Sequence, residues 1–206
     1  MNHANGTPAA IARAVAAGVP FAWVTADEAS GQAKWLQAWL EDQDIWYVMA
    51  IRCSDTVTMP EGERRADELI AAVPSQSWQK ISAGAGAHGP REYHWARIPV
   101  RTGQKRGRGH WLLARRSLSD PEEIAYYACY GPRRSSTADL AWTASSRCHV
   151  EECIQQAKGE AGLDHYQVRT WRAWYAHITL SMLALAWLAA SRAQAVKKGP
   201  APASRA

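Results

Sequence analysis

The feature that most constrains the fold is a strand–helix–strand pattern in the first quarter of the chain. Residues 19–25 (VPFAWVT) and 45–52 (IWYVMAIR) are short apolar runs, which are typical of buried strands. Residues 32–42 between them place Trp35, Leu36, Trp39 and Leu40 on one helical stripe. This spacing is that of a βαβ crossover, in which two parallel strands are joined through a helix. We therefore expect an α/β fold.

Asp27 directly follows the first predicted strand. Sites in open α/β sheets lie beyond the carboxyl ends of the strands, so a carboxylate that binds metal or substrate is expected there. The competing interpretation is an aspartate that accepts hydrogen bonds from the first amides of a helix. Position alone favours this capping interpretation.

The middle of the chain has a β-rich pattern. A short helix at 63–73 precedes two predicted hairpin strands, 91–101 and 110–118, which are joined by a basic turn. Residues 123–130 predict another strand. The glycine-rich run at 83–90 lacks the strand and the Gly-Lys-Ser/Thr ending of a phosphate-binding loop.

Helical patterns return in the last third of the chain. We expect one helix from residue 136 or 137 to about 159 and a second from 171 to about 192, followed by a tail of disordered composition. The most apolar run, 178–190, is shorter than the roughly 18 residues of a membrane span. We interpret it as a buried or interface helix.

The segment that carries the chemistry is Arg147 to Lys158. At about 100° per residue, Arg147, Glu151 and Lys158 share one narrow helical stripe. Val150 and Ile154 form an apolar strip beside it, which would place the Glu151 carboxylate at the edge of the core. Periodicity alone favours a plainer interpretation, a solvated i,i+4 pair of arginine and glutamate.

Composition restricts the partners only loosely. The net charge of +5 and a pI near 9.2 permit nucleic-acid binding without establishing it. The four cysteines show no C-x-x-C spacing, so reduced thiols are favoured over a zinc site. The N-terminus lacks the long apolar core of a signal peptide.

Several motifs together resemble a large group of bacterial insertion-sequence transposases of the DDE superfamily. The pattern R-x3-E-x6-K matches three of the four positions of their Y-R-E-K signature, and Ala144 stands where the tyrosine is expected. Further similar segments are FAWVTADEASGQ (21–32), WLLARRSL (111–118), KGEAGLDHYQVRTW (158–171) and the final WYAHITLSMLALAWLA. The resemblance covers nearly all of residues 8–192.

The resemblance implies a fold, a site and partners. It implies part of an RNase H-like fold: residues 8–53 carry the second catalytic aspartate, 54–135 form a β-rich insertion, 136–192 hold the glutamate helix and an apolar C-terminal helix, and 193–206 form the tail. Asp27 and Glu151 would be catalytic and would bind Mg²⁺ (or Mn²⁺) in a two-metal site. Arg147 and Lys158 would contact DNA, which would be the partner in a bacterial cytoplasm, at the nucleoid. No membrane partner is expected, and the full-length family member would be a possible homodimer.

One catalytic residue of the family has no counterpart. Residues 1–26 contain no Asp or Glu, and Glu28 adjoins Asp27 and cannot stand for a residue of a different strand. We therefore expect a transposase fragment that is inactive alone. Two alternatives remain open: a non-catalytic DNA-binding or regulatory remnant, and an unrelated α/β protein. One tryptophan of the insertion, Trp78, Trp95 or Trp111, could stack a flipped base, as in related transposases.

Overall fold

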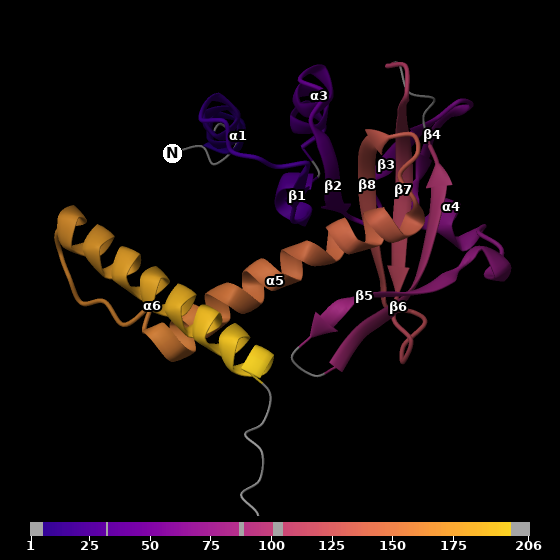
Figure 1. Cartoon of the computed structure of the whole chain (residues 1–206). Helices are drawn as coiled ribbons and strands as arrows, with labels where there is room; N and C mark the ends of the chain where they lie inside the picture. The colour runs from indigo at the N-terminus through magenta and orange to yellow at the C-terminus, as the bar shows by residue number, and fades with distance from the viewer. Residues whose placement is uncertain (1–5, 32, 87–88, 101–104, 199–206) are drawn as a thin grey trace, which may run out of the picture. The chain divides into compact units, whose positions relative to one another are not determined.

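The chain forms two compact units, residues 1–147 and 148–206. The computed structural model describes residues 6–31, 33–86, 89–100 and 105–198 (Figure 1). Over these residues the chain is mixed α/β, with one six-stranded sheet, a separate two-stranded hairpin and helices α1 to α6. The expected α/β class is therefore confirmed.

The predicted strands and long helices occur in the predicted order. Residues 62–65, however, form a strand where the sequence predicts a helix from residue 63, and the strands at 56–59 and 79–86 were not predicted. The first unit contains α1 (Gly6–Ala16), β1 (Trp23–Ala26), α2 (Glu28–Gly31), α3 (Lys34–Asp42), β2 (Trp46–Ile51), the hairpin β3 (Thr56–Met59) and β4 (Gly62–Arg65), and α4 (Ala66–Ala71). A 3-10 turn (Ser75–Ser77) leads to β5 (Gln79–Gly86), β6 (Gly89–Pro99), β7 (Arg108–Arg116) and β8 (Ile124–Pro132). Two long helices follow, α5 (Thr137–Ala161) and α6 (Trp171–Lys198). Helix α5 runs through Ser145 and Ser146 without a break.

The large sheet has the order β1-β2-β8-β7-β6-β5. Strands β1 and β2 are parallel, with Trp23 opposite Trp46, which confirms the predicted βαβ crossover. All other neighbouring pairs are antiparallel. Strand β2 lies beside β8, so residues of the predicted segments 8–53 and 54–135 contribute to one sheet. The strands of the β-rich segment carry apolar side chains on both faces, so they can be buried on both sides as a continuation of the sheet.

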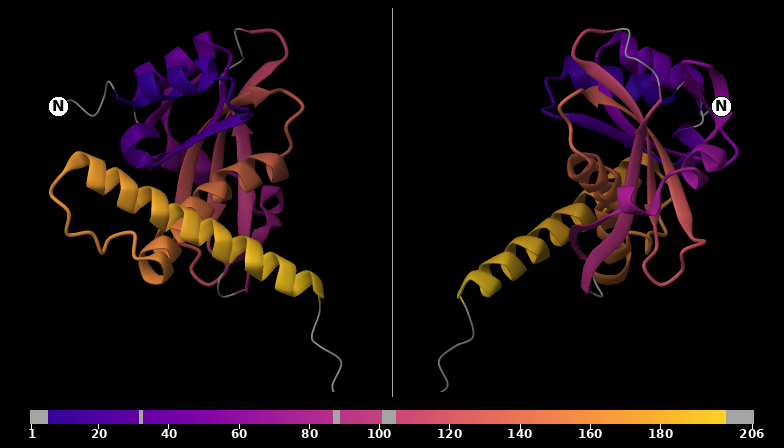
Figure 2. Two further views of the ribbon diagram at one scale, coloured as in Figure 1. Left: turned by 60° about the vertical axis from the view of Figure 1, so that its left-hand side comes forward. Right: turned by 90° about the vertical axis from the view of Figure 1, so that its right-hand side faces the viewer.

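Helices cover the two faces of this sheet, which can be followed in Figures 1 and 2. On one face, Leu36 and Leu40 of α3 pack with Tyr47, Met49 and Tyr130. The opposite face carries a second cluster, which the first turns of α5 cover; its buried members are Val48, Trp95, Trp111, Leu113, Cys129, Leu140, Ala141 and Ala144. A third cluster lies under α4 and the β3–β4 hairpin. Successive side chains of β2 and β8 point to opposite faces of the sheet, so each of these strands contributes buried residues to the clusters on both faces.

One glycine allows α2 to approach the sheet. A Cβ placed on Gly31 would lie 1.9 Å from the carbonyl oxygen of Ala50 in β2. No side chain fits at that distance from a backbone atom, so the backbone of α2 reaches β2 only through glycine.

The second unit contains the end of α5 and α6. Ala157, Ser181 and Leu185 are buried. His177 Nε2 lies 2.9 Å from the carbonyl oxygen of Gly162, and Arg192 donates to Glu160 Oε2 at 2.7 Å. These contacts join α6 to the C-terminal end of α5 and to the loop after it.

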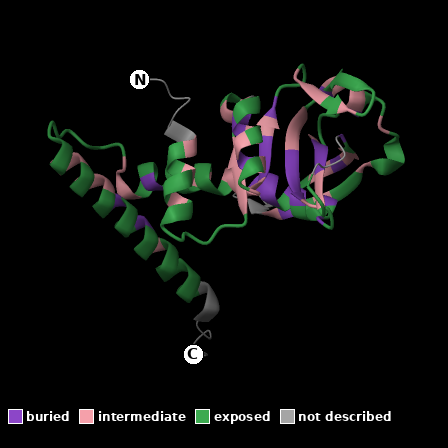
Figure 3. Cartoon of the chain, turned by 90° about the horizontal axis from the view of Figure 1, so that it is seen from above, coloured by how far each residue is buried: buried purple, intermediate pink, exposed green. Residues whose placement is uncertain are grey.

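Helix α6 is longer and more exposed than the sequence predicts. Its segment Trp171–Ala195 has 25 residues and a mean hydropathy of 1.4, which is long and apolar enough to cross a membrane. Only 6% of its most apolar window is buried, and Figure 3 shows the helix as mostly exposed. By length and composition alone, the helix that contains the run 178–190 could therefore span a membrane. The description as a buried helix is wrong, whereas the alternative of an interface helix stays a prediction. The helix begins at the predicted residue and continues about six residues beyond the predicted end, and among its described residues Ser181 and Leu185 are buried.

Candidate functional site

Asp27 lies directly after β1, as the sequence predicts, and is exposed. Its Oδ1 accepts a hydrogen bond from the backbone N–H of Ser30 at 3.0 Å. The aspartate therefore caps the four-residue helix α2, which is the interpretation that position alone favoured. Because a carboxylate accepts hydrogen bonds at two oxygens, capping through Oδ1 leaves capacity for a further ligand.

Other charged groups gather at the same end of β1 and β2. Arg52 follows β2 directly, and its Nε donates to Glu28 Oε1 at 3.0 Å. The backbone N–H of Arg52 donates to Asp55 Oδ2 at 2.9 Å. This end of the sheet therefore combines carboxylates with one guanidinium, a group suited to phosphate. Sequence reasoning missed Arg52, although its place right after a buried strand equals that of Asp27.

The charged stripe of α5 is a single helical surface. Arg147, Glu151 and Lys158 all lie within the unbroken helix, at positions i, i+4 and i+11. Arg147 is half-buried, whereas Glu151 and Lys158 are exposed. Val150 and Ile154 are 58% and 45% exposed. The apolar strip beside Glu151 is therefore largely exposed, so its burial does not support a place for Glu151 at the edge of a core, and that placement stays a prediction.

A metal centre stays a prediction. Asp27 belongs to the first unit and Glu151 to the second, and each is placed within its own unit. Among residues 6–31, 33–86, 89–100 and 105–198, three or more His, Cys, Asp or Glu side chains nowhere gather as metal ligands. The oxygen ligands of Asp27 and Glu151 suit Mg²⁺, but they are two where the resembled family uses three.

Two of the tryptophans considered for base stacking belong to the core. Trp95 is 0% exposed and Trp111 is 7% exposed, so neither ring can receive a base without unfolding its cluster. Trp78 is half-buried, and the Arg116 guanidinium lies 4.1 Å from its ring centroid. The prediction is therefore wrong for Trp95 and Trp111.

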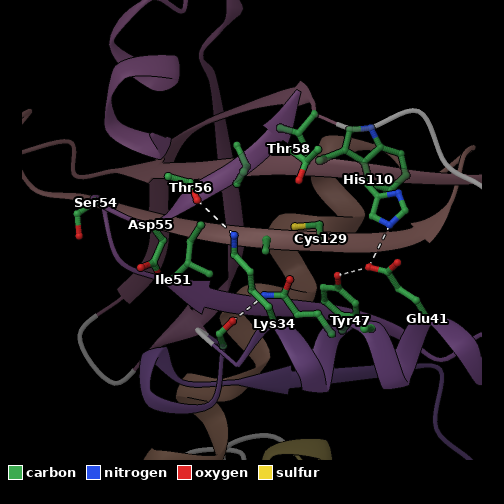
Figure 4. Close-up of a pocket in the computed structure, with 17 residues that line it drawn as sticks. Lys34, Glu41, Tyr47, Ile51, Ser54, Asp55, Thr56, Thr58, His110 and Cys129 are labelled. Carbon is green, nitrogen blue, oxygen red and sulfur yellow. Dashed lines mark hydrogen bonds and ion pairs between the residues drawn. The ribbon is translucent and has the colours of Figure 1, made fainter. Parts of the chain in front are cut away.

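A cavity of about 400 Å³ lies between α3, the β3 segment and the sheet (Figure 4). At one end, Tyr47 Oη donates to Glu41 Oε1 at 2.9 Å, and His110 Nε2 lies 3.1 Å from the same oxygen. At the other, Lys34 Nζ lies 3.3 Å from both Thr56 Oγ1 and Glu63 Oε1. The cavity thus offers a carboxylate–imidazole pair and an ammonium group to a small polar molecule. One signal for this cavity is present in the sequence: His110 is a polar residue at the start of a predicted strand that is otherwise apolar over its next residues.

Basic side chains at the start of β7 and just before it form hydrogen bonds with the end of the α3 segment. Arg108 makes two hydrogen bonds to the Asp44 carboxylate, and Lys105 Nζ donates to the carbonyl oxygen of Asp42 at 3.0 Å. Tyr130 Oη donates to Asp44 Oδ1 at 2.9 Å. The hydrogen bonds from Arg108, joined by the one from Tyr130, lower the pKa of Asp44 to about 2, against the opposing effect of burial. These contacts fix the end of α3 on the sheet.

No protein-family model matches the sequence, and no curated protein matches it. The function must therefore be argued from the residues and their geometry. Two groups of charged residues lie where the sequence predicts a site. They are Asp27 at the end of β1 and the stripe of Arg147, Glu151 and Lys158 on α5.

Proposed function

We propose that the chain is the C-terminal part of a DDE-type insertion-sequence transposase, an enzyme of metal-dependent DNA cleavage and strand transfer. The observation that carries the proposal is the position of Asp27, directly after the first strand of a parallel βαβ pair. The R-x3-E-x6-K pattern on one unbroken helix, with the resemblance of the flanking segments, supports it.

The same proposal includes a partial RNase H-like fold. Strand β1 is the first strand of the sheet order, and its side away from β2 pairs with no strand among the described residues. An unpaired row of backbone N–H and C=O groups accepts a further strand readily. The family's first strand, which carries the missing aspartate, would pair with this edge.

The chain's own residues would divide the work at the phosphodiester. Asp27 and Glu151 would hold magnesium or manganese, which stabilises the attacking and leaving oxygens of an in-line displacement at phosphorus. Arg147 would bind a phosphate through two parallel hydrogen bonds, and Lys158 would act as a point charge. Arg52, which follows β2 at the same end of the sheet as Asp27, would be a further phosphate-binding group.

The test is nicking of supercoiled plasmid with Mg²⁺ or Mn²⁺. The 206-residue chain alone should not nick, because its site has two of three acidic ligands and catalysis by positioned groups is sensitive to errors of about 1 Å. Addition of an upstream segment with the missing strands and aspartate should restore nicking. Asp27→Ala and Glu151→Gln should then abolish it.

The matched control is Glu152→Gln, which removes the same charge one residue away and off the stripe. The control should nick like the unsubstituted protein. Nicking by the chain alone that disappears in Asp27→Ala would show that the site is complete without the upstream segment. Nicking by the restored protein that survives Glu151→Gln would refute the assignment of the site.

A further inference from the structure

A groove of tryptophan and arginine side chains lies at the opposite end of β1 from Asp27. Two hollows of about 450 and 350 Å³ share Trp46, Pro132 and Arg134 in their walls and so form one groove. Trp23 and Trp142 line its first half, and Arg108 and Arg133 its second. We call this surface, made by Trp23, Trp46, Trp142, Arg108, Arg133 and Arg134, the tryptophan–arginine groove.

The rings of the groove are accessible and held in place. Trp23 and Trp46 pair across β1 and β2, with ring centroids 5.5 Å apart in an edge-to-face arrangement. A Cβ at Gly131 would lie 2.5 Å from a ring carbon of Trp23, so this glycine makes room for the indole over β8. Trp142 is 57% exposed. Half-buried and exposed indoles at fixed positions are surfaces on which a flat, unsaturated ring can stack.

The charge of the groove is positive. Arg133 and Arg134 are exposed, and neither guanidinium forms an ion pair in the described part of the chain. Arg108 is neutralised by Asp44, but its guanidinium lies 5.6 Å from the Trp46 ring centroid. The acidic lining residue, Asp139, uses its Oδ2 to accept hydrogen bonds from the backbone and hydroxyl of Ser136, both at 2.8 Å. Its role is therefore to start α5.

We propose that the tryptophan–arginine groove binds single-stranded DNA. Indole rings that adjoin two arginines without an ion pair in the described residues, Arg133 and Arg134, match a chain of bases on a phosphate backbone, because bases stack on the rings while guanidinium groups hold phosphates. Unpaired bases are needed, since the faces of paired bases are covered by their neighbours in the duplex. The groove lies at the amino end of β1 and β2, whereas Asp27 and Arg52 follow their carboxyl ends. It is thus a second DNA surface, separate from the proposed cleavage site.

The proposal is tested by fluorescence anisotropy of a labelled oligothymidylate of about 16 nucleotides against the full chain. Replacement of Trp46 by Leu removes a stacking surface and should weaken binding roughly ten-fold without changing its salt dependence. The double variant Arg133→Ala/Arg134→Ala should lower the slope of log affinity against log salt by about 1.4, which is two phosphates at 0.7 each. Trp46→Phe keeps an aromatic ring and should bind within roughly three-fold of the unsubstituted chain.

The matched control is Arg169→Ala/Arg172→Ala, which removes the same charge from exposed arginines outside the groove. It should keep the salt slope of the unsubstituted chain. Circular dichroism and urea midpoints exclude unfolding as the cause of any loss, and Trp46→Phe gives a second comparison if the leucine variant unfolds.

Three results would overturn the proposal. Equal affinity for a duplex of the same length would show that base stacking plays no part. Unchanged binding by the Trp46→Leu variant, with loss only in the arginine variant, would show an unspecific polyanion surface. Stronger binding of oligouridylate than of oligothymidylate would assign the groove to RNA instead of DNA. The plasmid nicking assay is independent of all three, so failure here and failure of the proposed function are distinguishable.

Discussion

The contact between Asp44 and Arg108 should be measurable as a pH-dependent part of the stability. Asp44 ends the α3 segment at a φ of 56°, and its carboxylate accepts hydrogen bonds from Arg108 and Tyr130. Replacement of Asp44 by Asn removes the charge and keeps a residue that tolerates left-handed backbone geometry. The variant therefore isolates the ion pair from backbone strain.

The expected size follows from the pKa. A fall of the Asp44 pKa from 3.8 to about 2 corresponds to about 2.5 kcal/mol at 1.36 kcal/mol per unit. The side chain of Asp44 is 39% exposed, so solvent screening reduces this figure to about 1 kcal/mol. Because the folded pKa is the lower one, this stability is present above about pH 4 and is lost as the pH falls through about 2.

Urea unfolding followed by tryptophan fluorescence gives the comparison. At pH 7, Asp44→Asn should lower the free energy of unfolding by about 1 kcal/mol, and the difference should shrink steadily below pH 4. Asp42→Asn, which removes an exposed carboxylate two residues away, is the control for net charge and should leave stability almost unchanged. A free energy equal to that of the unsubstituted chain at pH 7, or a loss that stays constant down to pH 2, would refute the reasoning.

Three further substitutions test the packing. Gly31→Ala should destabilise the chain by about 3 kcal/mol or more, because the new Cβ meets the backbone oxygen of Ala50; a thermal melt that matches the unsubstituted chain would contradict the close approach. Tyr47→Phe should cost about 1 kcal/mol in urea unfolding, since Glu41 loses a buried hydrogen bond, and an unchanged midpoint would argue against that bond. Trp187→Ser should leave the urea midpoint almost unchanged, because this ring is 73% exposed on α6; a clear loss of stability would show that the ring is packed.

The βαβ unit could be predicted because its signals are local. Apolar runs at 19–25 and 45–52, with a striped helix between them, match strands and helices that the structure contains within a few residues. The late strands and α5 were predictable for the same reason. Strand alternation and helical periodicity depend on residues that are close in the chain, so both can be recognised in a single sequence.

The shared sheet was not predictable from such signals. The pairing of Tyr47 with Tyr130 joins segments that are far apart in the chain, and no local pattern specifies it. The resemblance implied a β-rich insertion at 54–135 but not the neighbour of its strands, and the structure has β8 directly beside β2. The cavity at Glu41 and His110 was missed because its two polar residues come from α3 and β7, which meet only in the folded chain.

The candidate site was predicted in part. The position of Asp27 after β1 follows from the strand pattern, and its capping contact with Ser30 was the interpretation that position favoured. The exposure of Val150 and Ile154 was not predicted, because an apolar strip in a sequence does not state what covers it. Arg52 was missed since a lone arginine after a strand is common on solvated surfaces.

The pairing of β2 with β8 also has a consequence for the order of folding. Strands β5 to β8 form an antiparallel meander of sequence neighbours, whose short loops close quickly. Strand β2 gains its second neighbour only when Ile51 meets Tyr126, after a long stretch of chain has been brought together. We therefore expect the meander to form first and the βαβ unit that bears Asp27 to complete the sheet last. Deletion of β8 would leave β2 paired with β1 alone, so the strand pair that positions Asp27 depends on a segment about 100 residues farther along the chain.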